Sequence, residues 1–432
     1  MTLRLLLVLA MTFALPQSGT LTSEERALAT FVDADNDRAL ALLERVVNIN
    51  SGTMNFAGVR AVGAAFRSEF DALGFKTEWV DGTPFGRAGH LVADHPGPGP
   101  RMLLIGHLDT VFEADSPFQK FERVSAIAAK GPGITDMKGG NVVMLQALKA
   151  LQSVGLLKSM NIVVVMTGDE ESAGRPLATS RAALVKAAQG ADVAIGFEDG
   201  DGNPATAVIA RRGTTNWELR VKGKPAHSSQ IFNAENGYGA VFEAARILNA
   251  FREKLAGQPH LTFNPGVVLG GTAVEFDGPT SKGTGFGKGN VIAEHTVVAG
   301  DLRALSLEQF AAAKKAMQDI VAQSLPQTSA TLTFDDGYPP LAPTPGNERL
   351  LTLYNRASLD VGAGQVVAVD PDKAGAADVS FIAGQARMIL DGVGLMGTGG
   401  HTVNETADLR TLPSMTKRMA VLLARLQRDG AK

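Results

Sequence analysis

The chain has 432 residues, 45% of them hydrophobic, which is too long for one ordinary core and predicts two domains. A net charge of −3, from 41 basic and 44 acidic residues, gives no electrostatic basis for binding nucleic acid or a membrane surface. Because there is no cysteine, thiolate metal sites, cysteine nucleophiles and disulfides are excluded, and any metal must be bound by histidine and carboxylate, which suits zinc, manganese or cobalt.

Residues 1–20 have the pattern of a secretory signal peptide. Arg4 precedes an apolar run from Leu5 to Leu15 that is too short to span a bilayer. The pattern predicts cleavage between Ala14 and Leu21, and a periplasmic or secreted protein without a stable membrane anchor. The alternative is the apolar N-terminus of a cytoplasmic protein.

Residues 21–207 are predicted to form the first part of a domain with a parallel sheet. The pattern is helical from Ser23 to about Leu73, with a helix cap at Ser23. Strands and helices then alternate to about Ala194, including a helix from Asn141 to Gln152, and this order predicts helical crossovers between parallel strands.

Residues 208–338 have a different pattern, which predicts an inserted α+β domain of ferredoxin-like type. The expected order is strand, helix, strand, strand, helix, strand, at 214–227, 237–255, 262–269, 290–302, 306–324 and 330–335. The glycine-rich segment 278–290 lacks the spacing of a phosphate-binding loop and is predicted to be a mobile loop. Residues 339–432 return to the first pattern and end in a helix from Leu412 to Gln427.

Acidic and imidazole side chains follow four apolar strand-like runs. These runs are MLLIGHLDT, NIVVVMTGDEE, ADVAIGFEDG and MILDGVGLMGTGGH, which end with His107 and Asp109, Glu170 and Glu171, Glu198, and His401. Asp136 precedes the expected helix from Asn141. Because ligands bind beyond the carboxyl ends of strands in open α/β sheets, we expect these side chains to meet at one edge of the sheet.

This set of side chains predicts a two-metal site. Asp109, two residues after His107, points to the same side and can hold the imidazole in one tautomer. Adjacent carboxylates at Glu170 and Glu171 repel each other unless a cation lies nearby. Two divalent cations would lower the pKa of a bound water to roughly 7, and Glu170 could then carry a proton from that water to a leaving amine.

The motifs GHLDTVF, GPGITDMKGGNVVML, GDEE, GFEDG and GKPAHSS together resemble those of the M20 zinc metallopeptidases, most closely the glutamate carboxypeptidase branch. The resemblance covers nearly the whole mature chain. It implies an α/β domain with a parallel sheet and two zinc ions, interrupted by a ferredoxin-like lid and dimerisation domain. It implies one zinc bound by His107, Asp136 and Glu198, and a second bound by Asp136, Glu171 and His401. It also implies a cis peptide between Asp136 and Met137.

The same resemblance implies roles for other residues. Glu170 would be the catalytic acid and base, and Asp109 the partner of His107. His227, in the lid, would reach a site in a neighbouring subunit or act after lid closure, and Asn290 and Arg303 would bind the substrate carboxylate. The implied protein is a homodimer, and Co²⁺ or Mn²⁺ are possible substitutes for Zn²⁺.

The predicted activity is release of a C-terminal amino acid from a peptide or an N-acyl amino acid. Two alternatives are a non-peptidase deacylase of the same fold, of aminoacylase or desuccinylase type, and a catalytically silent metal- or peptide-binding protein. Two departures from the family pattern leave a preference for C-terminal glutamate undetermined. No basic residue follows Glu198 before Arg211, and the glycine-rich run before Asp378 is AGAAD.

Overall fold

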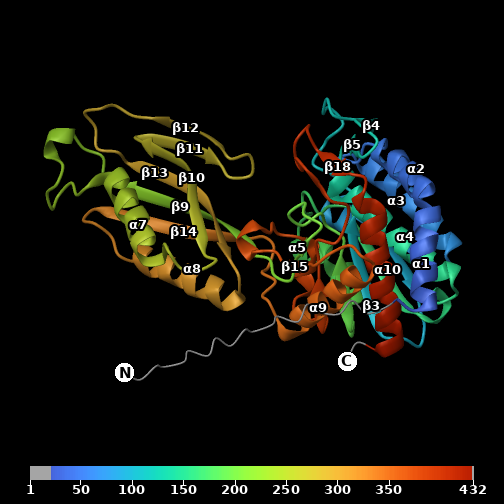
Figure 1. The fold of residues 1–432 in the computed structure, drawn as a ribbon. Helices are drawn as coiled ribbons and strands as arrows, with labels where there is room; N and C mark the ends of the chain where they lie inside the picture. The colour runs from blue at the N-terminus through green and yellow to red at the C-terminus, as the bar shows by residue number, and fades with distance from the viewer. Residues whose placement is uncertain (1–20, 431–432) are drawn as a thin grey trace, which may run out of the picture.

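The computed structural model describes residues 21–430, which form two units joined by two crossing segments (Figure 1). The predicted signal peptide at residues 1–20 lies outside the described residues. Within the part of the chain that the structure describes, none of the helices combines the length and apolar character needed to cross a membrane.

The first unit is built on a six-stranded sheet in the order β1-β2-β6-β3-β7-β16. The strands β6, β3, β7 and β16 are parallel, as predicted, whereas β2 runs antiparallel to both of its neighbours, β1 and β6, so the sheet is mixed. The central strands are continuous apolar runs because helices cover both of their faces. The bounds are β1 Lys76–Asp81, β2 Gly89–His95, β3 Arg101–His107, β6 Asn161–Thr167, β7 Val193–Gly196 and β16 Met388–Leu390.

Alternate residues of each central strand enter two different cores. Leu104 and Val164 pack with the larger helical layer, whereas Leu103 and Val163 pack against α6 and the short helix Asp378–Ile382. The side chains of α4 are buried along almost its whole length, because it lies between the sheet and the terminal helices. The helices are α1 Ser23–Ala34, α2 Asn36–Val47, α3 Phe56–Ala72, α4 Gly140–Ser153, α5 Leu177–Ser180, α6 Ala182–Ala188, α9 Pro345–Asp360 and α10 Thr411–Asp429.

Short strands complete the first unit. A four-stranded sheet in the order β17-β18-β5-β4 joins segments far apart in the sequence near the functional side chains, and β15 pairs with β8. Their bounds are β4 Glu122–Arg123, β5 Ala128–Lys130, β8 Thr206–Ala207, β15 Val367–Ala368, β17 Gly397–Thr398 and β18 Thr406–Asp408.

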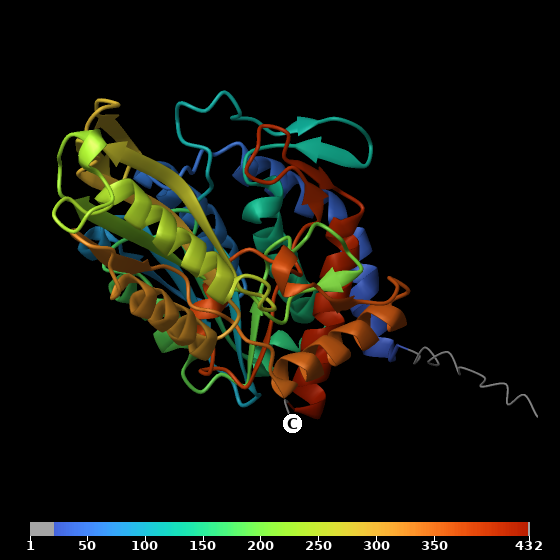
Figure 2. The same cartoon turned by 90° about the vertical axis from the view of Figure 1, so that its left-hand side faces the viewer.

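The second unit has an antiparallel sheet in the order β10-β13-β9-β14, and two helices cover one face. Its strand and helix order is the ferredoxin-like order that the sequence predicts. Figure 2 shows α7 and α8 side by side over this sheet. Trp217, Leu219 and Phe251 belong to its separate apolar core. The bounds are β9 Gly213–Gly223, α7 Gly239–Leu255, β10 Thr262–Gly271, β13 His295–Ala304, α8 Leu307–Val321 and β14 Thr328–Asp336.

Three local predictions were wrong. Thr22, not Ser23, caps α1, because the Thr22 side chain accepts from the Glu25 N–H and the Glu25 carboxylate accepts from the Thr22 N–H. The expected loop 278–290 contains β12 (Lys282–Phe286), which pairs with β11 (Ala273–Asp277) in a hairpin. The strand expected from Asn290 begins at His295.

Candidate metal centre

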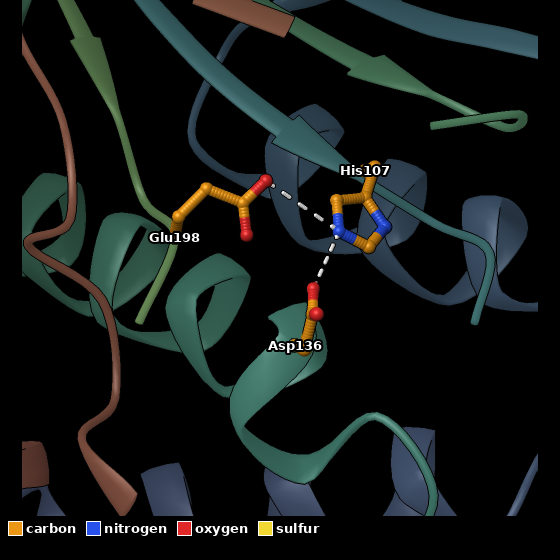
Figure 3. Close-up of side chains that lie close together, drawn as sticks. All are labelled: His107, Asp136 and Glu198. Atoms are coloured by element: carbon orange, nitrogen blue, oxygen red, sulfur yellow. Dashed lines mark hydrogen bonds and ion pairs between the residues drawn. The ribbon is translucent and has the colours of Figure 1, made fainter. Parts of the chain in front are cut away.

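His107 ends the buried strand β3 and presents its Nε2 atom to two carboxylates (Figure 3). His107 Nε2 lies 2.9 Å from Asp136 Oδ1 and 3.6 Å from Glu198 Oε1. Its other ring nitrogen, Nδ1, lies 3.0 Å from the Asp109 carbonyl oxygen. A proton on Nδ1 would satisfy that contact and leave Nε2 available to a cation.

A second group shares Asp136. The Nε2 atom of His401 lies 2.9 Å from Asp136 Oδ2 and 3.2 Å from Glu171 Oε2. Asp136 therefore directs one carboxylate oxygen to each histidine. In both groups, His107–Asp136–Glu198 and Asp136–Glu171–His401, the candidate ligand atoms lie within 4.8 Å of one another. This is the geometry of two neighbouring cation sites with one bridging carboxylate.

The position of His401 differs from the expected strand end. Strand β16 ends at Leu390, and His401 lies in the loop between β17 and β18 with a φ of 61°. This loop returns to the site because β18 pairs with β5. The histidine is the most exposed of the five candidate ligands, with 59% of its side chain accessible.

Glu405 fixes the segment that carries Asp136. This buried carboxylate accepts from the N–H groups of Gly133, Thr135 and Asp136 at 2.9, 2.8 and 3.2 Å. The peptide between Asp136 and Met137 is cis, as predicted. Glu405 and His401 belong to the same loop, so this loop supplies one candidate ligand and also holds the shared one.

The crowded charges of the site are compatible with a bound cation. Burial and the nearby Asp136 charge raise the pKa of Glu171 to about 7, although His401 opposes the shift. Burial raises the pKa of Glu198 to about 8, with Asp136 adding to it and His107 opposing it. Glu171 Oε1 is buried and has no hydrogen-bond partner among residues 21–430. Divalent cations would neutralise these crowded carboxylates and occupy that oxygen, so the residues fit the implied metal pair.

Asp109 connects the metal ligands to Glu170. Its buried carboxylate accepts from the N–H groups of Glu170 and Glu171 at 3.0 and 3.1 Å, and from the Thr53 hydroxyl at 2.6 Å. Asp109 Oδ1 also lies 3.5 Å from His107 Nδ1, so the expected pairing holds only as a longer contact. Burial raises the pKa of Glu170 well above its ordinary value, and the Glu198 and Asp378 charges add to the shift.

Sequence reasoning missed four supporting residues: Thr53, Arg181, Tyr338 and Glu405. Arg181 is buried and forms ion pairs with Asp169 and Asp378, both at 2.7 Å. Thr53 and Tyr338 lie far from the motifs in sequence, whereas Glu405 lies in the same loop as His401. The one signal for Arg181 in the sequence was the presence of an arginine shortly after an acidic strand end.

The structure separates the three candidate substrate-binding residues of the second unit. His227 and Asn290 belong to adjacent segments, because the Ser228 N–H donates to the Asn290 carbonyl at 2.9 Å. The segment 224–238 lies at the end of this unit farthest from the first (Figure 1). Arg303 lies at the opposite end of β13, where it pairs with Thr214 and bonds Asp301 at 3.0 Å. The eight residue steps from His295 to Arg303 span about 26 Å of strand.

Comparison with known proteins agrees with this geometry. The model of peptidase family M20/M25/M40 matches residues 103–425. The chain is 26% identical over 421 residues to carboxypeptidase G2 of Pseudomonas sp. (strain RS-16), covering 95% of this chain and 94% of that protein. It is 28% identical over 216 residues to acetylornithine deacetylase of Pasteurella multocida (strain Pm70), covering 47% and 54%.

A solved structure has the same fold. The Bacillus subtilis YXEP protein, a dinuclear metal binding peptidase from the M20 family, superposes with a TM-score of 0.64 at 15% identity, covering 92% of this chain and 99% of that one. At this identity the likeness shows the fold alone. The family match spans most of the chain, and it contains all five candidate metal ligands and Glu170. The protein belongs to peptidase family M20/M25/M40 and is a hydrolase of the metallopeptidase and amidohydrolase type.

Proposed function

We propose that the protein is a dinuclear zinc amidohydrolase that releases a C-terminal amino acid from peptides or N-acyl amino acids. The observation that carries this proposal is the pair of ligand groups sharing Asp136, with Glu170 beside them. The similarity to carboxypeptidase G2, which covers 95% of this chain, supports cleavage before the C-terminal residue of the substrate.

Different residues would bind the two ions, transfer the proton and hold the backbone of the site. His107, Asp136 and Glu198 would hold one ion, and Asp136, Glu171 and His401 the other. The bound zinc pair would supply Lewis acidity and a water of lowered pKa. Glu170, outside both ligand groups, accepts a proton from the attacking water and delivers it to the leaving nitrogen. Asp109 fixes the backbone at Glu170 and Glu171, so the base and one ligand keep a constant separation.

Residues of the second unit would bind the rest of the substrate. Arg303 lies at the end of β13 near the first unit, and its guanidinium can hold a substrate carboxylate through two parallel hydrogen bonds. His227 and Asn290 lie at the far end, so we propose that they serve the site of a partner subunit in a homodimer. A cluster of exposed apolar residues supports such an interface: Phe232, Val241, Phe242 and Val268 are 48–55% exposed. These residues lie on and around α7 and the edge strand β10.

The second candidate is a deacylase of the same fold. The similarity to acetylornithine deacetylase favours it, although that match covers about half of this chain. A catalytically silent binding protein is disfavoured, because Glu170 and both ligand groups are intact and Glu170 is held in place by Asp109.

A substrate panel tests the proposal. The zinc-loaded enzyme would be incubated with dipeptides, N-acyl amino acids and the C-terminal amide of each, and the released products followed by mass spectrometry. We expect release of free C-terminal amino acids and little cleavage of the amides. Cleavage restricted to one short acyl group such as acetyl or succinyl would establish the deacylase instead. No hydrolysis of any amide under any metal loading would favour the silent binding protein.

We also propose that the protein is exported to the periplasm or secreted. The support is the apolar run from Leu5 to Leu15 after Arg4, which has the length of a signal peptide core. The test is to express the full-length protein, fractionate the cells and sequence the N-terminus of the protein in each fraction. We expect a new N-terminus between residues 14 and 21. An intact Met1 in the cytosolic fraction would contradict it.

A further inference from the structure

The backbone around Glu170 is held by side chains rather than by secondary structure. Asp109 accepts from the Glu170 and Glu171 N–H groups. Arg181 Nη2 donates to the Asp169 carbonyl at 3.1 Å, and the Tyr338 hydroxyl donates to the Glu170 carbonyl at 2.6 Å. Three side chains therefore fix the peptide groups on both sides of the proposed base.

Tyr338 is itself held in a defined position. Its hydroxyl oxygen accepts from Arg181 Nη2 at 2.9 Å, and its ring centroid lies 4.9 Å from that of Phe381. The Arg181 guanidinium lies 5.7 Å from the Tyr338 ring centroid. Since Arg181 is buried and paired with two carboxylates, it gives the tyrosine hydroxyl little freedom to turn away from Glu170.

The backbone of Tyr338 belongs to a connection between the two units. The Tyr338 carbonyl accepts from the Thr214 N–H at 2.8 Å, and its own N–H donates to Thr214 Oγ1 at 3.3 Å. Farther along the same connection, Arg211 and Leu341 exchange two backbone hydrogen bonds of 2.9 Å. These segments run side by side where the chain enters and leaves the second unit. A rotation of that unit would therefore act on Tyr338 directly.

We propose that Tyr338 is a positioning residue that couples the placement of the second unit to the backbone of Glu170. The inference rests on the proposed function only in giving Glu170 the role of base. Among the side chains holding this backbone, Asp109 and Arg181 lie within the first unit, whereas Tyr338 lies in the connection. Displacement of the connection would break the hydrogen bond to the Glu170 carbonyl and free the carboxylate to leave its working position.

Tyr338→Phe tests the contact, because it removes the hydroxyl and keeps the ring. We expect kcat to fall about five- to tenfold, with KM and the number of bound metals unchanged. Hydrogen exchange in peptides covering 168–174 should speed up, in metal-free and metal-loaded protein alike. Tyr354→Phe is the matched control, since this buried tyrosine of the first unit contacts Met415 and lies outside the site. Unchanged exchange at 168–174 in Tyr338→Phe would overturn the proposal.

Two double variants distinguish positioning from general stabilisation. Combined with Glu170→Gln, Tyr338→Phe should cause no further loss of the residual rate, because its effect passes through Glu170. Thr214→Val removes the contact to the Tyr338 N–H; it should lower kcat in the wild-type background and have no effect in the Tyr338→Phe background. Additive losses in either pair would overturn the coupling. Wild-type turnover by Glu170→Gln would instead remove the base from the proposed function, a separate and recognisable failure.

Discussion

At the scale of single residues, Asp136 is the side chain that makes the two ligand groups neighbours. Its two oxygens face His107 and His401, each at 2.9 Å, so one side chain joins the two ligand groups. Hydrogen bonds from these histidines lower its pKa, although burial opposes the shift, and it stays ionised beside carboxyls whose pKa values are raised. A bridging ligand needs this persistent negative charge.

Arg303 provides a test of substrate choice. Arg303→Ala should lower kcat/KM for substrates with a free α-carboxylate about tenfold or more, because charge-assisted hydrogen bonds contribute about 1.5–3 kcal/mol each. The matching C-terminal amides should lose much less. Arg303→Lys should restore little, since a point charge lacks the fork geometry of guanidinium. Equal losses on acids and amides would show that the arginine serves only its ion pair with Asp301.

At the scale of elements, two loops meet at Glu405 and create the ligand arrangement. The Glu405 carboxylate accepts hydrogen bonds from several backbone N–H groups. Glu405→Gln would replace one of its acceptor oxygens with an NH₂ donor, which cannot accept from them. We expect metal affinity to fall about 10- to 100-fold, the usual result of losing a residue that orients a ligand. Competition with a chromogenic chelator measures this. Asn404→Ala, an exposed neighbour in the same loop, is the control and should retain wild-type affinity.

The contact between α1 and α10 gives a pH-dependent prediction. Burial of Glu25 opposes its ionisation, but hydrogen bonds from Arg425, Thr22 and Arg428 outweigh burial and lower its pKa from 4.5 to about 2. Because the folded pKa is depressed, the stabilisation is complete above pH 4.5 and is lost as the pH falls toward 2.

Glu25→Gln should therefore lower the free energy of unfolding by about 1.5–3 kcal/mol at pH 7. The difference in the free energy of unfolding between variant and wild type should disappear as the pH decreases from about 4.5 toward 2. Urea unfolding at several pH values measures it, with the exposed Glu24→Gln as control. A gap that stays constant between pH 6 and pH 3 would rule out the charge as its origin.

The sequence predicts elements best where periodicity and burial coincide. The apolar runs at β3, β6 and β7 and the helix α4 were found because their residues are buried on nearly every side. The hairpin β11–β12 was missed because β12 is glycine-rich and fully exposed, and because the five residues of β11 give too short an apolar alternation to signal a strand. The loop holding His401 returns to the site through the pairing of β18 with β5, a long-range contact that leaves no local signal.

At the scale of the whole molecule, the exposed apolar cluster on the second unit predicts association. Phe232 and Phe242 have ring centroids 5.2 Å apart, and both are about half exposed. A charge buried in an apolar interface is strongly unfavourable. Phe242→Glu should therefore convert dimers to monomers in light scattering coupled to size exclusion, and lower activity if His227 acts in trans.

Val124→Glu, at an equally exposed apolar position of the first unit, is the control and should leave the dimer intact. A wild-type protein that is monomeric at all concentrations would contradict both the dimer and the proposed role of His227 in a partner's site. In that case His227 would have to reach the metals by a large closure of its own chain, or have no catalytic role.

The most direct test of the two-metal account is to measure bound metal and turnover together in Glu170→Ala. Glu170 lies outside both ligand groups, so the variant should bind two zinc ions per chain while losing turnover by about 10²–10⁴-fold. Activity within a few-fold of wild type would contradict the assignment of Glu170 as the base. Loss of one metal would mean that Glu170, not Glu171, is the ligand.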